Sequence, residues 1–143
     1  MFDMNKSTLG QVILVVEDSP TQAITVQSLL EDAGLSVICA TSGKEGLRLA
    51  HQVNPALILL DVQMPDMNGF EVCDTLKADR DTSDIPVIMF TRNDSPEAVK
   101  QGLKHGAVDY IPKDAFASAV LLETLRQMGF IKTNKGVKNR EDE

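Results

Sequence analysis

The chain has 143 residues, of which 43% are hydrophobic, so it can form one domain with a single core. Its formal net charge of −7 argues against nucleic acid or an anionic membrane as the main partner, because both need a basic surface. Cys39 and Cys73 have no metal-like spacing and are expected to be reduced, and no apolar run approaches the roughly 18 residues of a membrane span. These features predict a soluble, cytoplasmic protein.

Five apolar runs of strand type occur along the chain. Their unbroken hydrophobic character is typical of strands that are buried on both faces of a parallel sheet. They cover residues 12–16, 35–40, 57–60, 86–91 and 107–113. Polar residues stand at the carboxyl ends of four of these runs, namely Glu17 and Asp18, Asp61, Thr91 and Lys113.

Helical periodicity follows each run. Ser19 is expected to cap the first helix, with Gln22 completing a capping box, and Asp114 is expected to cap the fifth. In the fifth helix the spacing places Val120 and Met128 on the apolar face. The expected helices cover residues 20–33, 43–51, 70–76, 96–103 and 115–128.

Five alternations of strand and helix with short connections predict a parallel sheet covered on both faces by right-handed crossovers. The carboxyl ends of parallel strands lie at one edge, so Glu17, Asp18, Asp61, Thr91 and Lys113 should converge there. Each residue alone has an ordinary explanation, such as a turn or a helix cap. Together, however, three neighbouring carboxylates repel one another unless a cation or a proton neutralises them. A ligand set of oxygens alone favours Mg²⁺ over zinc or copper.

With these residues in place, the chain resembles the receiver domains of two-component response regulators. The resemblance implies an α/β, flavodoxin-like, doubly wound fold, with five parallel strands in the order 2-1-3-4-5 and five helices. It assigns residues 11–130 to the receiver domain. Residues 1–10 would form a flexible lead-in, and residues 131–143 a disordered tail or the start of a linker.

The resemblance also implies how the acids act. Glu17, Asp18, Asp61 and the backbone carbonyl of Gln63 would hold Mg²⁺. Asp61 would accept a phosphoryl group from a sensor histidine kinase or a phosphotransfer protein. The chain would therefore take part in a phosphorelay, without direct binding to nucleic acid or membrane, as a monomer or weak dimer.

Three further residues match the family's pattern. Thr91 and Lys113 would contact the phosphoryl group, and Thr91 and Tyr110 would change position when the domain is activated. The output partner does not follow from the sequence. In this interpretation the protein is a switch, which catalyses at most its own phosphorylation and dephosphorylation.

Two positions depart from the family. Arg92 stands where a small residue is usual, so it could modulate dephosphorylation beside the phosphoryl group or serve a partner-binding surface. Asp114 stands where the family usually has a proline joined by a cis bond. We expect the Lys113–Asp114 bond to remain cis, although a cis non-proline bond costs about 3–4 kcal/mol.

Three other functions fit parts of the pattern. An aspartate-nucleophile phosphatase would normally have a second aspartate where this chain has Gln63. A flavin-binding module would need a phosphate loop after the first strand, where Glu17 and Asp18 would repel phosphate. A degenerate receiver that binds partners without phosphorylation is the more serious alternative, and Thr91 and Lys113 argue against it.

Overall fold

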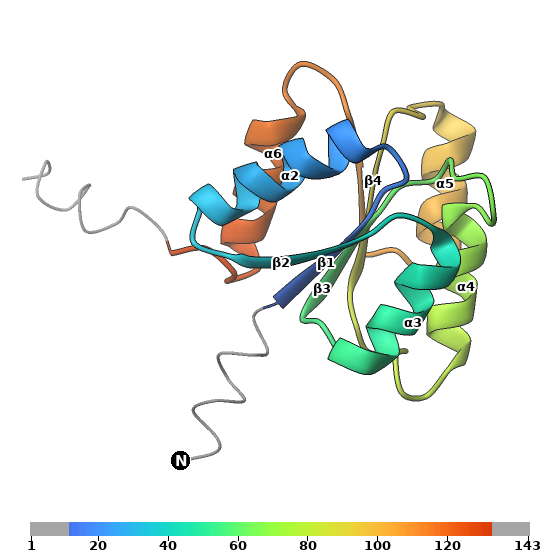
Figure 1. Cartoon of the computed structure of the whole chain (residues 1–143). Coiled ribbons are helices and arrows are strands. Elements are labelled where there is room, and N and C mark those ends of the chain that lie inside the picture. The colour runs from blue at the N-terminus through green and yellow to red at the C-terminus, as the bar shows by residue number, and fades with distance from the viewer. Residues whose placement is uncertain (1–11, 133–143) are drawn as a thin grey trace, which may run out of the picture.

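The computed structural model describes residues 12–132. The predicted lead-in and the tail from residue 133 therefore lie outside the described residues. Five strands are present, namely β1 (Val12–Val16), β2 (Ser36–Ala40), β3 (Leu57–Leu60), β4 (Val87–Thr91) and β5 (Asp109–Pro112). They alternate with five helices (Figure 1), namely α2 (Pro20–Asp32), α3 (Gly43–Val53), α4 (Gly69–Ala78), α5 (Pro96–Lys104) and α6 (Ala117–Gln127).

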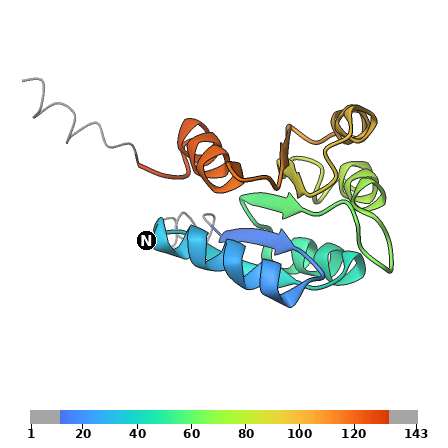
Figure 2. The ribbon, with the colours of Figure 1, turned by 90° about the horizontal axis from the view of Figure 1, so that it is seen from above.

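The strands form one parallel sheet in the order β2-β1-β3-β4-β5, which confirms the predicted fold class. Helices α2 and α6 cover one face of the sheet, and α3, α4 and α5 cover the other (Figure 1). Helices α4 and α5 lie next to each other in the view from above as well (Figure 2). None of the helices within residues 12–132 is long and apolar enough to cross a membrane.

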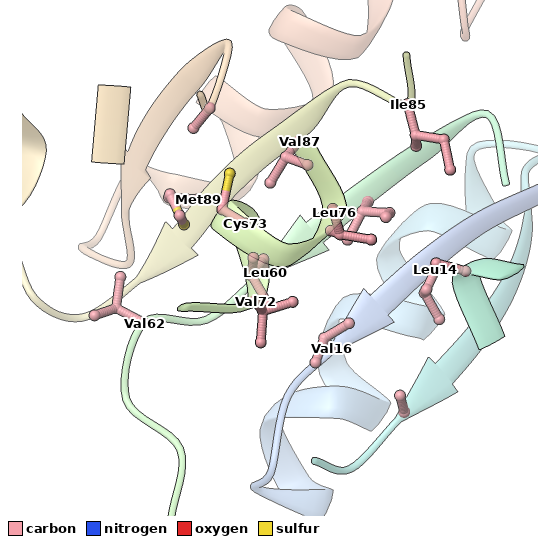
Figure 3. Packing of buried hydrophobic residues seen from close by; sticks show 14 of the residues in the cluster. Leu14, Val16, Leu60, Val62, Val72, Cys73, Leu76, Ile85, Val87 and Met89 are labelled. Atoms are coloured by element: carbon pink, nitrogen blue, oxygen red, sulfur yellow. The ribbon is translucent and has the colours of Figure 1, made fainter. Parts of the chain in front are cut away.

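The core is divided between the two faces of the sheet, because successive side chains of a strand point to opposite sides. In β1, Ile13 and Val15 pack with α2 and α6. Leu14 and Val16 pack with α3 and α4 on the other side (Figure 3). Helix α3 comes close to β1 at Gly46, where an added Cβ atom would lie 2.8 Å from a methyl group of Val16. These contacts fix the carboxyl end of β1, from which the acidic pair extends.

Most of the predicted helix boundaries are confirmed. The side chain of Ser19 accepts a hydrogen bond from the backbone N–H of Gln22 at 3.4 Å, and Pro20 begins α2. After α2 the chain turns at Gly34, which has a left-handed φ of 93°. A capping box that the prediction missed joins Asn68 and Glu71 at the start of α4.

Two details near the helices were predicted wrongly. The side chain of Gln22 does not complete a capping box, since it accepts a hydrogen bond from Lys113. Asp114 does not cap α6, because the helix begins at Ala117 and the Asp114 carboxylate instead accepts a hydrogen bond from the backbone N–H of Phe116 at 2.8 Å. Both side chains thus accept hydrogen bonds from groups other than the ones predicted for a helix cap.

The apolar face of α6 also differs from the prediction. Its buried residues are spaced four apart, at Ala117, Leu121 and Leu125. Val120 precedes Leu121 by one residue, which places it about 100° around the helix, and its side chain is 45% exposed. Met128 follows the last helical residue and is 38% exposed. The buried stripe of α6 is therefore narrower than predicted.

The Lys113–Asp114 bond is trans, because none of the peptide bonds among the described residues is cis, and the prediction of a cis bond was wrong. A residue other than proline at position 114 keeps the usual strong preference for the trans form. The N–H of Lys113 continues the pairing of β5 with β4 by donating to the carbonyl of Thr91 at 2.7 Å, and the backbone then turns, with the N–H of Asp114 donating to the carbonyl of Pro112 at 3.0 Å. Lys113 thus reaches the strand ends from a trans backbone.

Both cysteines are free, as predicted. Cys73 is buried in α4 and Cys39 is half-buried in the edge strand β2. Burial raises the pKa of the Cys73 thiol to about 11, so this group is protonated at neutral pH and packs as a small apolar residue.

Replacement of two α6 residues tests the packing of this helix. Leu125→Ala should lower the free energy of unfolding by about 2–5 kcal/mol, because Leu125 is 0% exposed and its removal leaves a cavity. Val120→Ala should change it by about 0.5 kcal/mol or less, because nearly half of Val120 is already exposed to solvent and lies outside the buried stripe. Urea unfolding followed by circular dichroism measures both. Equal losses would contradict the narrow buried stripe.

Candidate functional site

Three carboxylates meet at the carboxyl edge of the sheet. Glu17 and Asp18 follow β1, Asp61 follows β3, and one oxygen of each lies within 4.8 Å of the others. Glu17 is only 2% exposed and Asp61 9%. Their backbone N–H groups continue the hydrogen bonding of the sheet, with Glu17 donating to Ala40 at 2.9 Å and Asp61 donating to Val16 at 3.1 Å. The sheet itself therefore fixes where these acids stand.

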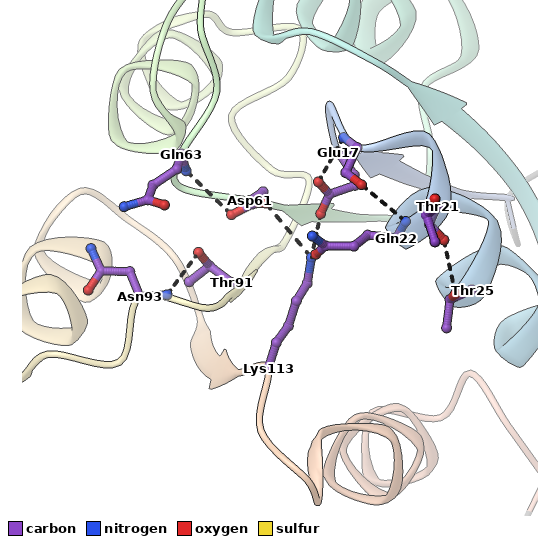
Figure 4. Close-up of polar contacts among 10 residues, drawn as sticks. Glu17, Thr21, Gln22, Thr25, Asp61, Gln63, Thr91, Asn93 and Lys113 are labelled. Atoms are coloured by element: carbon purple, nitrogen blue, oxygen red, sulfur yellow. Dashed lines mark hydrogen bonds and ion pairs between the residues drawn. The ribbon is translucent and has the colours of Figure 1, made fainter.

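The ammonium group of Lys113 lies among these acids (Figure 4). It pairs with Glu17, donates a hydrogen bond to the side-chain oxygen of Gln22 at 2.7 Å, and lies 3.8 Å from an oxygen of Asp61. It also lies 5.3 Å from the centre of the Phe90 ring. One side chain from the end of β5 thus contacts residues that follow β1 and β3, as the topology predicted.

The charge balance of the cluster favours a cation. Burial raises the pKa of Glu17 above its ordinary value, while the pair with Lys113 and the backbone N–H of Ser19, 3.1 Å away, lower it. Three carboxylates and one ammonium leave excess negative charge in a partly buried place. The ligands available are all oxygens, which is the donor set that Mg²⁺ prefers. The side chains present therefore fit a magnesium ion.

A pocket of about 530 Å³ opens beside the cluster. Gln63 lies at this pocket, and its backbone N–H donates to Asp61 at 3.3 Å. The pocket is lined by Asp18, Val62, Gln63, Met64, Pro65, Asn68 and Asn93. It gives an incoming group access to the acids from the side of the loop that follows β3.

Thr91 and Tyr110 both contact the backbone of Asn93. The Thr91 hydroxyl accepts a hydrogen bond from the N–H of Asn93 at 3.3 Å, and the Tyr110 hydroxyl donates to the carbonyl of the same residue. Both side chains are buried. The ring of Tyr110 fits against α5 at Gly102, where an added Cβ atom would lie 2.7 Å from it. The two residues predicted to move together are thus linked through the backbone of one residue, Asn93.

Arg92 is placed differently from the other predicted site residues. Its side chain is exposed and lines a second pocket, of about 320 Å³, together with Lys113. This pocket lies between α2 and α6, and its lining includes Gln22 and Ser118. Arg92 does not line the pocket beside Asp18.

Two residues of the site were missed by the sequence analysis. Gln22 could have been found, because it lies in the first turn of the predicted helix, which follows the strand end that carries Glu17 and Asp18. Asn93 takes part through its backbone, which has no sequence signature of its own.

Residues 13–126 match the sequence profile of the response regulator receiver domain. The chain belongs to this family. Receiver domains are signalling modules of two-component systems, and this membership sets aside the phosphatase and flavin-binding alternatives.

Individual relatives agree with the assignment. Protein PilH of Pseudomonas aeruginosa is 41% identical over 101 residues, which are 71% of this chain and 84% of PilH. The DNA-binding regulator RpaA of Synechocystis is 42% identical over 101 residues, but the matched part is only 42% of RpaA. The structure of the chemotaxis response regulator CheY4 of Vibrio cholerae has a TM-score of 0.74 at 34% identity, covering 81% of this chain and 96% of CheY4. The chain thus spans less than half of the DNA-binding relative that it matches.

The charge of Asp61 should be measurable at Tyr110, the single tyrosine of a chain without tryptophan. Burial raises the pKa of Tyr110, and the negative charges of Asp61 and Asp94 raise it further by opposing a phenolate. Asp61→Asn should therefore lower this pKa, while burial keeps it above the ordinary value of about 10. Absorbance of the phenolate during an alkaline titration measures the shift. Asp32→Asn, on the opposite face of the sheet, serves as the control, and equal shifts in the two variants would contradict the prediction.

Proposed function

We propose that this receiver domain accepts a phosphoryl group on Asp61 in a magnesium-dependent reaction. The donor would be a sensor histidine kinase or a phosphotransfer protein, and the modification would change the surface of the domain. The observation that supports the proposal is the ammonium of Lys113 between Glu17 and Asp61, at an edge with three carboxylates. An ammonium held in this position can stabilise the charge of a transferring phosphoryl group.

Glu17, Asp18, Asp61 and the backbone carbonyl of Gln63 would hold the magnesium ion. When bound, the ion would offset the carboxylate charge that otherwise repels an incoming phosphate, and it would stabilise the charge of the transferring group. Asp18 and Gln63 line the pocket of about 530 Å³, so they stand where such a group would enter.

Asp61 would act as the nucleophile. One of its carboxylate oxygens forms a bond to phosphorus as the bond from phosphorus to the donor breaks, and the donor leaves with that electron pair. Lys113, already 3.8 Å from Asp61, stays close enough to pair with the phosphoryl oxygens. Thr91, at the end of β4 beside β3, would contact the same group through its hydroxyl.

The change of surface would follow from the hydrogen bonds of Asn93. A Thr91 hydroxyl that turns to a phosphoryl group gives up the bond from the Asn93 N–H. Because the Tyr110 hydroxyl donates a hydrogen bond to the carbonyl of Asn93, a movement of the Asn93 backbone would change the environment of Tyr110. The loop leads directly into α5, so we infer that the surface around α5 and β5 reports phosphorylation to the partner.

The remaining assignments are also part of the proposal. The receiver domain would span residues 11–130 and would act in the cytoplasm as a monomer or weak dimer, without direct contact to nucleic acid or membrane. A degenerate receiver, which would bind partners without phosphorylation, is the alternative that the first experiment below decides.

Phosphorylation is tested by mass spectrometry after incubation with acetyl phosphate. The native chain should gain one phosphoryl group when Mg²⁺ is present and none when a chelator removes it. Asp61→Asn should gain none, because the amide is a poor nucleophile. Incorporation by Asp61→Asn equal to that of the native chain would refute the assignment. A native chain that gains no phosphoryl group would favour the degenerate receiver.

Arg92 gives a second, quantitative test. A long cation directly after Thr91 can obstruct the water that hydrolyses an aspartyl phosphate and can pair with its oxygens. Arg92→Ala should therefore lose phosphate faster, by a few-fold to tenfold, or about 1 kcal/mol in the barrier. Decay is measured after removal of the donor, with Arg80→Ala in an exposed loop as control. Equal rates of phosphate loss for Arg92→Ala and the native chain would contradict a role in dephosphorylation and would favour the alternative that Arg92 serves a partner-binding surface.

A further inference from the structure

The loop that follows Asp61 is attached to the start of α3 through Asp66. One carboxylate oxygen of Asp66 accepts a hydrogen bond from the backbone N–H of Gly43 at 3.1 Å, and the other accepts one from Lys44 at 2.9 Å. These N–H groups belong to the first turn of α3, where the helix has no backbone acceptors for them and its dipole favours an anion. These hydrogen bonds lower the pKa of Asp66, and the bond from the Lys44 N–H has the largest effect. The carboxylate is therefore charged at neutral pH.

A second contact holds the loop at the same place. Met67 packs into the space left by the absent side chain of Gly43, since an added Cβ atom there would collide with Met67 and lie 2.9 Å from Val72. Two successive loop residues thus dock on the first turn of α3, one by hydrogen bonds and one by packing.

The two ends of the loop are fixed independently of Asp66. Gly69 donates its N–H to the carbonyl of Val62 at 2.7 Å, and a side chain at Gly69 would collide with the carbonyl of Asp61. At the far end, Asn68 and Glu71 form the capping box of α4. Between these points lies the span from Gln63 to Asp66. The N–H of Gln63 is bonded to Asp61 at 3.3 Å at the start of this span, and Asp66 attaches its other end to α3.

This middle span forms one wall of the pocket beside the acids. Gln63, Met64 and Pro65 line the pocket together with Asp18, whereas Asp66 does not. Asp66 therefore affects the pocket indirectly, because it holds the loop backbone that lines the pocket. We propose that Asp66 is a positioning residue, which holds the loop so that the backbone of Gln63 is in place for the metal before the metal binds.

This inference rests on the proposed function, because it concerns the affinity for magnesium. A loop that is already ordered loses less conformational entropy when its carbonyl becomes a ligand. Residues that orient metal ligands without touching the metal commonly change affinity by about tenfold or more when replaced. Loss of the Asp66 anchor should therefore weaken Mg²⁺ binding although Asp66 is not a ligand.

A simpler explanation is that Asp66 only stabilises α3. Ser42 provides a matched control, because its side chain caps the same helix by accepting a hydrogen bond from the N–H of Glu45 at 3.1 Å, a bond that does not involve the loop. Ser42→Ala removes a cap from α3 and leaves the loop anchored. Asp66→Ala removes the anchor, and Asp66→Asn keeps one oxygen and so part of it.

The experiment measures Mg²⁺ binding by isothermal titration calorimetry in the native chain and these three variants. Asp66→Ala should bind about tenfold more weakly, Asp66→Asn should fall between it and the native chain, and Ser42→Ala should match the native chain. Hydrogen exchange of the amides in residues 62–66, measured without metal, should be faster in Asp66→Ala and unchanged in Ser42→Ala.

The outcomes separate this inference from the proposed function. If the native chain binds Mg²⁺ and Asp66→Ala binds it equally well, Asp66 is no positioning residue and the proposed function stands. If Ser42→Ala loses as much affinity as Asp66→Ala, the effect belongs to the stability of α3 and the inference is overturned as well. A native chain that binds no Mg²⁺ would refute the proposed function and this inference together.

Discussion

The arrangement of the site depends on carboxylates held close together at the edge of a hydrophobic sheet. Glu17 and Asp61 are both buried, and burial of like charges costs free energy unless an opposite charge compensates them. Lys113 supplies one positive charge, which cannot balance both of these acids and Asp18. The fold tolerates this imbalance because β1 and β3, which carry the acids, are held by apolar contacts on both faces. The unbalanced charge makes the site receptive to a cation.

The same edge is connected to the surface by short links. The carbonyl of Asn93 accepts a hydrogen bond from the Tyr110 hydroxyl, and the N–H of Asn93 donates one to the Thr91 hydroxyl. The side-chain oxygen of Asn93 accepts a further hydrogen bond from the N–H of Ser95 at 3.3 Å. Ser95 caps α5, and the ring of Tyr110 packs against the same helix at Gly102. A displacement of Thr91 therefore reaches the start and the middle of α5 through few hydrogen bonds and close contacts.

The sequence predicted the sheet and the convergence of Asp61 and Lys113, because both follow from apolar periodicity and from the geometry of parallel strands. It did not predict the partners of Gln22, Asn93 and Asp114. The side-chain oxygen of Gln22 can accept a hydrogen bond either from a backbone N–H at the helix start or from a lysine. Only the tertiary position of Lys113 determines which of the two bonds forms. Asn93 acts through its backbone, which carries no signature of residue type. Asp114 accepts from the N–H two residues later, and because Asp is common both in such turns and at helix caps, its residue type does not distinguish the two.

Glu17 has two roles in the proposed function that compete for the same carboxylate. One of its oxygens accepts from Lys113 and the other from the N–H of Ser19. A carboxylate that also faces a divalent cation attracts an ammonium less strongly, because the charge of the cation offsets its own. Lys113 lies 3.8 Å from Asp61 even while it is paired with Glu17. Weaker pairing would free its ammonium to follow the negative charge that arrives with a phosphoryl group on Asp61, so one buried carboxylate would link metal binding to the contact made by Lys113.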